Sequence, residues 1–362
     1  MKLTFSNQVA AKQRGIALII VMVVVVFLGI LAGGFAYSMK VETTLARNSN
    51  LTPEMEWAGR AGIEMAKYIL AQQVQISPQA DHLGQKWAGG SGNTNDVLAD
   101  INLADNQLGH GKFTIKIIDC ERKMNINIAP TDILNRALTM IGVDASDIST
   151  ISDSIADWID TDDRAHIAGA ESDYYLGLNP PYYAKNGPVD DVTELLMIRG
   201  VTPEIYWGTA GPHHDPKAVD AASSPSSTTF SSQAVAYTGG LWDVFTAVSA
   251  GQLNINTASA GALQLLPGID EHMAENIMKQ RAGPDGMEGT EDDTPFMNVQ
   301  QLLAVPGLNP ALAQQLIRYI TVRSTTFEVQ VDVEFGSSKR RYYGLLRRNS
   351  GTDIQLLHLH WD

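Results

Sequence analysis

The stretch "LNINTASAGALQLLPGID", from Leu253 to Asp270, decides how the middle of the chain folds. It predicts a short helix, a hairpin at Pro267-Gly268 and the start of a second helix, because Pro and Gly end one helix and turn the chain into the next. This is the outline of a helix-hairpin-helix unit. Units of this kind often hold nucleic-acid phosphates through the N–H groups of a glycine-rich hairpin, helped by nearby Lys or Arg.

The charge of the chain argues against a nucleic-acid partner. The 362 residues carry a formal net charge of −14, whereas nucleic-acid binding depends largely on Lys and Arg that neutralise phosphates. The hairpins at Pro267-Gly268 and Pro306-Gly307 both lack the second glycine of a G-x-G hairpin, and Asp270 and Glu271 would repel phosphate. We therefore expect no nucleic-acid partner, and we expect the hairpins to pack helices and to face protein.

The same pattern occurs twice. "MNINIAPTDIL", from Met124, matches "LNINTASAGAL", from Leu253, and an acidic loop and an L-L-x-x-x-G segment follow in both copies in the same order. Repetition of one order of motifs is typical of a duplicated structural unit. We predict two helical modules, at residues 124–210 and 251–323. A polar, Ser-rich segment at 211–250 is typical of a flexible linker.

The chain ends in strands. "FEVQVDVEF", from Phe327 to Phe335, alternates apolar and polar residues without a break, and "RRYYGLLRR" and "IQLLHLHW" follow after turn residues. An earlier strand at 112–120 needs partners, and these strands are the best candidates. The sequence thus predicts an antiparallel sheet with one buried face. The helical modules would be an insertion between its first strand and the others.

The N-terminal region predicts a membrane anchor. No charged residue occurs from Ile16 to Met39, and a helix of this length crosses the ~30 Å apolar core of a bilayer. Lys2, Lys12 and Arg14 precede it, which favours a cytoplasmic N-terminus and an exported remainder. A cleaved signal peptide and a plain signal anchor are the alternatives.

Two acidic loops are candidate calcium sites. "GPDGMEGTEDD" ends at Asp293, and "WIDTDD" ends at Asp163, with Glu171 and Asp173 following. Calcium takes six to eight oxygen ligands, and glycine-rich loops allow carboxylates and carbonyls to converge. The alternative is a pair of solvated acidic turns. We find no nucleophile, zinc-protease, C-x-x-C or phosphate-loop motif, so we expect a protein that is not an enzyme.

The N-terminus also resembles a known family. "KQRG" followed by "IALIIVMVVVVFLGILAGG" resembles the type IV prepilin leader, which implies cleavage after Gly15 by prepilin peptidase and methylation of Ile16. Most members carry Glu at the fifth mature position, where this chain has Ile20. In that departure and in three further segments the chain resembles the minor pseudopilin K (GspK) family of type II secretion systems. The segments are "DWIDTDD", "LNINTASAGALQLLPGI" and the closing "YYGLLRR".

The resemblance implies a location, partners and a metal. A member of this family would cap the tip of the periplasmic pseudopilus, with GspI and GspJ as partners and GspH below. It would bind one or two calcium ions in the inserted helical domain. The residues that the resemblance makes candidate ligands are Asp160, Asp162, Asp163, Asp285, Thr290, Asp292 and Asp293.

The sequence therefore predicts an α+β protein with a pilin-like long N-terminal helix, an antiparallel sheet and a large all-α, helix-hairpin-helix-like domain inserted in the sheet. The predicted parts are a leader (1–15), a transmembrane segment (16–39), the rest of the helix with a loop and first strand (40–123), module 1 (124–210), a linker (211–250), module 2 (251–323) and C-terminal strands (324–362). We expect a tip subunit anchored once in the inner membrane, with its C-terminal domain in the periplasm.

One alternative assigns the chain to another fibre. It would be a minor tip pilin of a type IV or DNA-uptake pilus, whose hairpins would touch DNA. Its only support in the sequence is the basic group Arg340, Arg341, Arg347 and Arg348.

Overall fold

The computed structural model describes residues 14–92, 97–208 and 239–362. The predicted leader lies outside these residues except for its last two positions. Most of the predicted linker also lies outside them.

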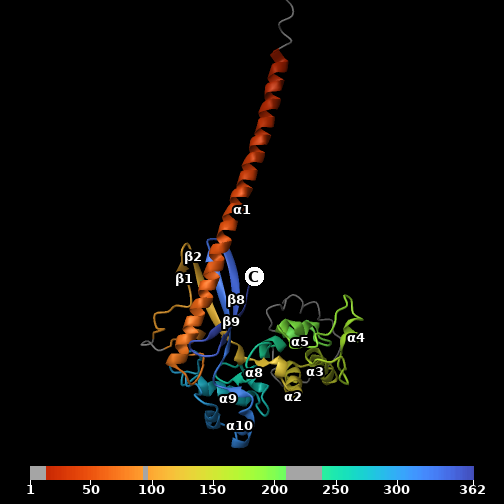
Figure 1. The fold of residues 1–362 in the computed structure, drawn as a ribbon, viewed down its shortest axis with the longest axis vertical. Coiled ribbons are helices and arrows are strands. Elements are labelled where there is room, and N and C mark those ends of the chain that lie inside the picture. Colours follow the sequence, from red (N-terminus) through yellow and green to blue (C-terminus); the bar gives the residue numbers. More distant parts are fainter. Residues whose placement is uncertain (1–13, 93–96, 209–238) are drawn as a thin grey trace, which may run out of the picture.

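The chain begins with one long helix, α1 (Arg14–Ile76). Its segment Ala17–Leu45 has a mean hydropathy of 3.0, and none of it is buried inside the protein. Figure 1 shows this part rising alone from the folded body, while the end of the helix lies against the sheet. An apolar helix of this length without protein contacts fits a single-pass membrane anchor.

Five strands form one antiparallel sheet in the order β1-β2-β7-β8-β9. They are β1 (Asn106–Leu108), β2 (Gly111–Asp119), β7 (Thr326–Phe335), β8 (Ser338–Arg348) and β9 (Ile354–Trp361). The alternation in β7 behaves as predicted, because its apolar residues are buried and the polar ones between them are not. The strand predicted at 112–120 is β2, and it pairs with β7 as expected.

The buried face of the sheet is covered by α1. The helix approaches so closely that a Cβ at Gly59 would lie 2.6 Å from the Tyr342 ring, and one at Gly62 would lie 2.4 Å from Val331. Glycine is needed at both positions because no side chain fits there. The predicted α+β class, with a long N-terminal helix on an antiparallel sheet, is confirmed.

The helical segments lie between β2 and β7, at the end of the sheet away from the membrane helix (Figure 1). The first module contains η2 (Cys120–Arg122), β3 (Met124–Asn125), η3 (Ile126–Ile128), α2 (Thr131–Ile141), α3 (Ala145–Ile159), α4 (Ser172–Tyr175), η4 (Val192–Met197), α5 (Pro203–Trp207), α7 (Leu241–Val244) and β4 (Phe245–Thr246). The second contains β5 (Leu253–Asn254), α8 (Ala260–Gln264), α9 (Glu271–Arg281), η5 (Val299–Ala304), α10 (Pro310–Leu316) and β6 (Ile320–Thr321). A short 3-10 helix, η1 (Lys86–Ala88), follows α1.

Each module is closed by a pair of parallel two-residue strands. In module 1, β3 pairs with β4, and in module 2, β5 pairs with β6. This corrects the predicted end of the linker at residue 250. Leu241, Val244 and Phe245 are buried in the core of the inserted domain, because β4 supplies the closing strand of module 1. The described part of the predicted linker therefore belongs to that module.

The two modules share one apolar core, which runs from Ile133 and Trp158 in module 1 to Leu263 and Ile277 in module 2. A second core lies between α1 and the sheet. The inserted modules therefore form one domain with a continuous interior, joined to a helix-on-sheet domain.

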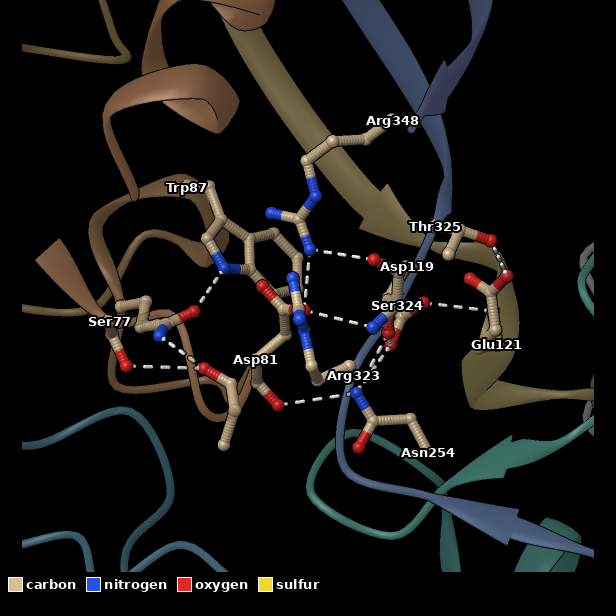
Figure 2. A network of polar contacts seen from close by, with 12 residues as sticks. Ser77, Asp81, Trp87, Asp119, Glu121, Asn254, Arg323, Ser324, Thr325 and Arg348 are labelled. Carbon is tan, nitrogen blue, oxygen red and sulfur yellow. Dashed lines mark hydrogen bonds and ion pairs between the residues drawn. The ribbon is translucent and has the colours of Figure 1, made fainter. Parts of the chain in front are cut away.

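A buried network of charged and polar groups joins these two domains (Figure 2). Arg348 donates through Nη2 to the Asp81 carboxylate at 2.5 Å and to the Ser324 carbonyl at 2.6 Å, and both charged side chains are almost fully buried. The Asp119 carboxylate accepts from the Ser324 hydroxyl at 2.7 Å and from the Asn254 amide at 3.2 Å. Burial, together with the nearby Glu121 carboxylate, raises the pKa of Asp119 well above its usual value.

We predict that Arg348→Met lowers the free energy of unfolding by about 3–5 kcal/mol, because it leaves the Asp81 carboxylate buried without its cation. The neighbouring Arg347 is exposed, so Arg347→Met should change it by no more than about 0.5 kcal/mol. Denaturant unfolding of the two full-length variants in detergent measures the difference. Equal losses in both variants would contradict the role given to the buried pair.

Candidate functional site

The repeated N-I-N motif makes the same backbone contact in both modules. In module 2 the Asn256 side chain exchanges two hydrogen bonds with the backbone of Phe296, at 2.9 and 2.8 Å. In module 1 Asn127 makes the same pair with Val189, at 2.9 and 2.7 Å. These amides tie the segment that follows each acidic loop to the opening strand. This role of the two asparagines was not predicted from the sequence, although the recurrence of N-I-N was a signal of it.

The first acidic loop gathers three carboxylates. Asp160, Asp162 and Glu171 place ligand oxygens within 4.8 Å of one another. Glu171 is only 5% exposed, and neither of its carboxylate oxygens has a hydrogen-bond partner among the described residues. Burial, followed by repulsion from the neighbouring carboxylates of Asp157 and Asp160, raises the pKa of Glu171 to about 7. A divalent cation would supply the positive charge that this cluster lacks, and carboxylate oxygens are what calcium prefers.

A fourth acid, Asp157, is already used in shaping the loop. It is fully buried and accepts from the backbone N–H of His166 at 3.0 Å and contacts the His166 ring. This contact raises the pKa of His166. Gly169 lies so close that a Cβ there would overlap the Asp157 carboxylate. Asp157 and His166 were not predicted from the sequence, because nothing in one sequence distinguishes a buried helical Asp from a surface one.

The third acid predicted in this loop, Asp163, does not join the cluster. Its carboxylate accepts from the Asn186 side chain at 2.8 Å and from the Ser172 hydroxyl at 3.4 Å. Of the three residues predicted in the first loop, the structure therefore brings together Asp160 and Asp162. Their third member is Glu171, which the sequence placed only as a residue that follows the loop.

The second acidic loop satisfies its own carboxylates. Asp292 accepts from the Asp285 N–H at 3.1 Å and from the Thr290 hydroxyl at 2.8 Å, and the Thr290 contact lowers the pKa of Asp292. Asp293 accepts from the Gly289 N–H at 2.9 Å. Within the described residues, groups of three or more His, Cys, Asp or Glu that converge in this way occur in the first loop and not in the second.

Both hairpins of module 2 have partners inside the protein. The hairpin after α8 offers the carbonyls of Gln264, Leu266 and Ile269 to Nη1 of Arg136, at 3.3, 3.0 and 3.2 Å. Arg136 belongs to α2 of module 1, so this hairpin packs against the other module. In the second hairpin, the Pro306 carbonyl accepts from Asn276 at 3.2 Å.

The basic residues of β8 do not form a common patch. Arg348 is buried against Asp81, and Arg341 pairs with Asp332 on the neighbouring strand at 2.5 and 3.1 Å. Two of the four arginines that supported a DNA-binding alternative are thus already engaged with carboxylates.

The predicted processing and assembly residues lie at the start of α1. Gly15 and Ile16 belong to its first turn, and the helix begins at Arg14. Ile20 is 57% exposed on the segment proposed to span the membrane.

Known proteins share these features. The family model described as "Type II secretion system (T2SS), protein K" matches residues 105–208, and a helix-hairpin-helix model matches residues 248–321. The type II secretion system protein K of Klebsiella pneumoniae is 27% identical over 202 residues, which cover 54% of this chain and 60% of the relative. The Pseudomonas aeruginosa protein of that name is 24% identical over 360 residues, which cover 95% of this chain and 92% of the relative.

A solved structure has the same fold. The crystal structure of the GspK-GspI-GspJ complex from the enterotoxigenic Escherichia coli type 2 secretion system matches with a TM-score of 0.62 at 18% identity. The match covers 88% of this chain and 99% of the other.

These observations first define a class by its fold: a long N-terminal helix, whose apolar part fits a single-pass membrane anchor, packs on an antiparallel sheet that carries an inserted helical domain. Within that class the chain resembles the type II secretion system protein K proteins, through the family model over residues 105–208 and through relatives at 24–27% identity, and it shares the fold of the solved GspK. The relatives are named as secretion-system components and not as enzymes, in agreement with the prediction from sequence.

We predict that Arg136→Met weakens the packing of module 1 on module 2, because three hairpin carbonyls lose their donor. The expected loss is about 1–3 kcal/mol in the free energy of unfolding. Lys279→Met on α9, where the side chain is mostly exposed, is the control and should have little effect. Hydrogen exchange at residues 264–270 checks the site directly, and unchanged protection there in the Arg136 variant would refute the prediction.

Proposed function

We propose that this chain is a minor pseudopilin at the tip of the periplasmic type II secretion pseudopilus, where it initiates or caps assembly for protein export. The observation that carries the proposal is the place of the inserted domain. It lies at the end of the sheet opposite the membrane helix (Figure 1). A domain of this bulk would obstruct the addition of another subunit above it.

The residue at position 20 supports the same role. In pilin-like fibres the acid at this position is thought to neutralise the N-terminal amine of a neighbour inside the apolar bundle. An unpaired carboxylate within a membrane is costly. A tip subunit has no neighbour above it, so the apolar Ile20 avoids that cost. The residue therefore favours initiation over elongation.

The partners and the orientation follow from family and charge. The similar solved structure is a complex of GspK with GspI and GspJ, and we propose the corresponding minor pseudopilins as partners of this chain, with a GspH-type subunit below. Lys2, Lys12 and Arg14 favour a cytoplasmic N-terminus in the inner membrane. Prepilin peptidase would cut after Gly15 and methylate Ile16.

The inserted domain would hold calcium. The first loop is the better site, because Asp160, Asp162 and the buried Glu171 converge and Glu171 lacks other partners. The second loop, with Asp285, Thr290, Asp292 and Asp293, would take a second ion only by giving up internal hydrogen bonds. The ion would stabilise the loop between α3 and α4.

The first test is the intact mass of the mature protein extracted from membranes. We expect a chain that begins at N-methylated Ile16. A chain that begins at Met1 would make this a plain signal anchor. A start after the apolar segment would make it a free exported protein, and the tip-subunit proposal would fail with it.

The calcium proposal has its own test. Chelator should lower the melting temperature of the full-length protein in detergent, and added calcium should restore it, since an ion that binds only the folded state stabilises it. Glu171→Gln should abolish most of this response, whereas Asp292→Asn should leave it largely intact. If chelator leaves the melting temperature of the unmodified protein unchanged, calcium binding is refuted. If Asp292→Asn abolishes the response and Glu171→Gln does not, the main site is the second loop.

A further inference from the structure

We infer that the free edge of β9 is a docking edge, on which an extended segment of a different pilin-like subunit adds a strand to the sheet. This inference rests on the proposed function, because it takes the neighbour to be another subunit of the same fibre. The expected segment is uncharged and carries apolar side chains at alternate positions.

The two edges of the sheet differ in how they are covered. On one side, β1 pairs with the start of β2, and the loop before it continues the cover. There the Leu103 carbonyl accepts from the Ile115 N–H at 2.7 Å, and the Asp105 N–H donates to the Thr114 hydroxyl at 3.1 Å. On the other side, β9 has β8 as its single strand neighbour within the described residues. The eight residues of β9 form the long uncovered edge.

The β9 edge lacks most of the usual protection. Natural edge strands are kept from pairing by charged side chains, proline, short length, β-bulges or a covering segment. "IQLLHLHW" contains no Lys, Arg, Asp, Glu or Pro, and Leu356, Leu357 and Trp361 are 37%, 47% and 56% exposed. β9 has one of these devices, a bulge at Leu357, which has no Cα partner in β8 because Leu345 pairs with His358 and Leu346 with Leu356. Beyond the bulge, His358 to Trp361 pair regularly with β8.

The direction of the backbone shows what this edge offers. The Asp362 N–H donates to the Arg341 carbonyl at 3.0 Å, which turns that residue toward β8. Because main-chain groups alternate sides along a strand, Leu359 and Trp361 direct their N–H and C=O groups to the free edge. An added strand would satisfy these groups by main-chain hydrogen bonds, and the apolar side chains beside them would select its sequence.

The membrane anchor excludes a second copy of this chain as the occupant. Two identical edges close a dimer by antiparallel pairing about a two-fold axis perpendicular to the sheet. That axis also reverses the direction of α1 in one copy. Both copies enter the same membrane through α1 in the same direction, so the symmetric pair cannot form there. The occupant is therefore a different chain. The proposed function makes it another subunit of the same fibre, whose own helix runs parallel to α1 in the membrane.

The test compares edge and non-edge lysines in the full-length chain. Tagged protein is co-produced with the GspI- and GspJ-type pseudopilins of the same bacterium and purified in detergent, and the co-purified subunits are quantified. Leu357→Lys on β9 is matched by Leu303→Lys on η5, where the leucine is 49% exposed. We expect Leu357→Lys to reduce co-purification by about tenfold, because a charge on an edge strand blocks pairing, and Leu303→Lys to leave it unchanged. Equal melting temperatures verify that both variants fold.

Three outcomes would go against the inference, and they are distinguishable. If Leu357→Lys retains its partners as the unmodified chain does, the β9 edge is not the docking site, while the proposed function stands. If the unmodified chain captures neither subunit, the proposed function itself fails. A Leu357→Cys variant that forms a disulfide-linked dimer of this chain in membranes would show that a second copy occupies the edge.

Discussion

The arrangement of the whole molecule depends on the buried polar joint around Asp119 and the Arg348–Asp81 pair. Charges so far from water are tolerated only when their oxygens and N–H groups find partners. Asp119 accepts from four donors, on Glu121, Asn254, Thr257 and Ser324. The chain leaves the sheet after β2, forms the inserted domain and returns to the sheet at β7. Because β2 and β7 are adjacent strands, these two connections alone would act as a hinge between the domains. The network connects the segments on both sides of that hinge and makes it a fixed joint.

The sequence predicted the parts of the structure that depend on local pattern. The alternation from Phe327 to Phe335 sufficed to identify a half-buried strand, and the recurrence of N-I-N identified two modules. It did not reveal contacts between distant residues, because a single sequence holds no record of them. Arg348 and Asp81 are 267 positions apart, and Arg136 reaches hairpin carbonyls of the other module. In the sequence, Arg348, Asp81 and Arg136 all resemble ordinary surface charges.

The same limit explains the candidate cation site. The run of acids at 160–163 is visible in the sequence, but which of its members converge depends on the path of the loop. The Asn186 side chain donates to Asp163, which lies outside the cluster, and the chain brings Glu171 into the cluster as it returns to the N-cap of α4. The boundary of module 1 was misplaced for a related reason. Its closing strand, β4, is two residues long and is recognisable only by its pairing with β3.

The two modules have one framework and have diverged in what it carries. Both use an asparagine to clamp the segment after the acidic loop, and both close with a parallel strand pair. In module 2 the loop carboxylates are satisfied by N–H and hydroxyl groups of the loop, and a hairpin is turned inward onto Arg136. In module 1 the buried Glu171 carboxylate has no such donor among the residues that the structure describes. One framework thus carries a loop with internally satisfied carboxylates in one copy and a cluster of converging carboxylates in the other. In module 2, which matches a helix-hairpin-helix model, the hairpin carbonyls face Arg136, so the motif here serves to pack one module on the other.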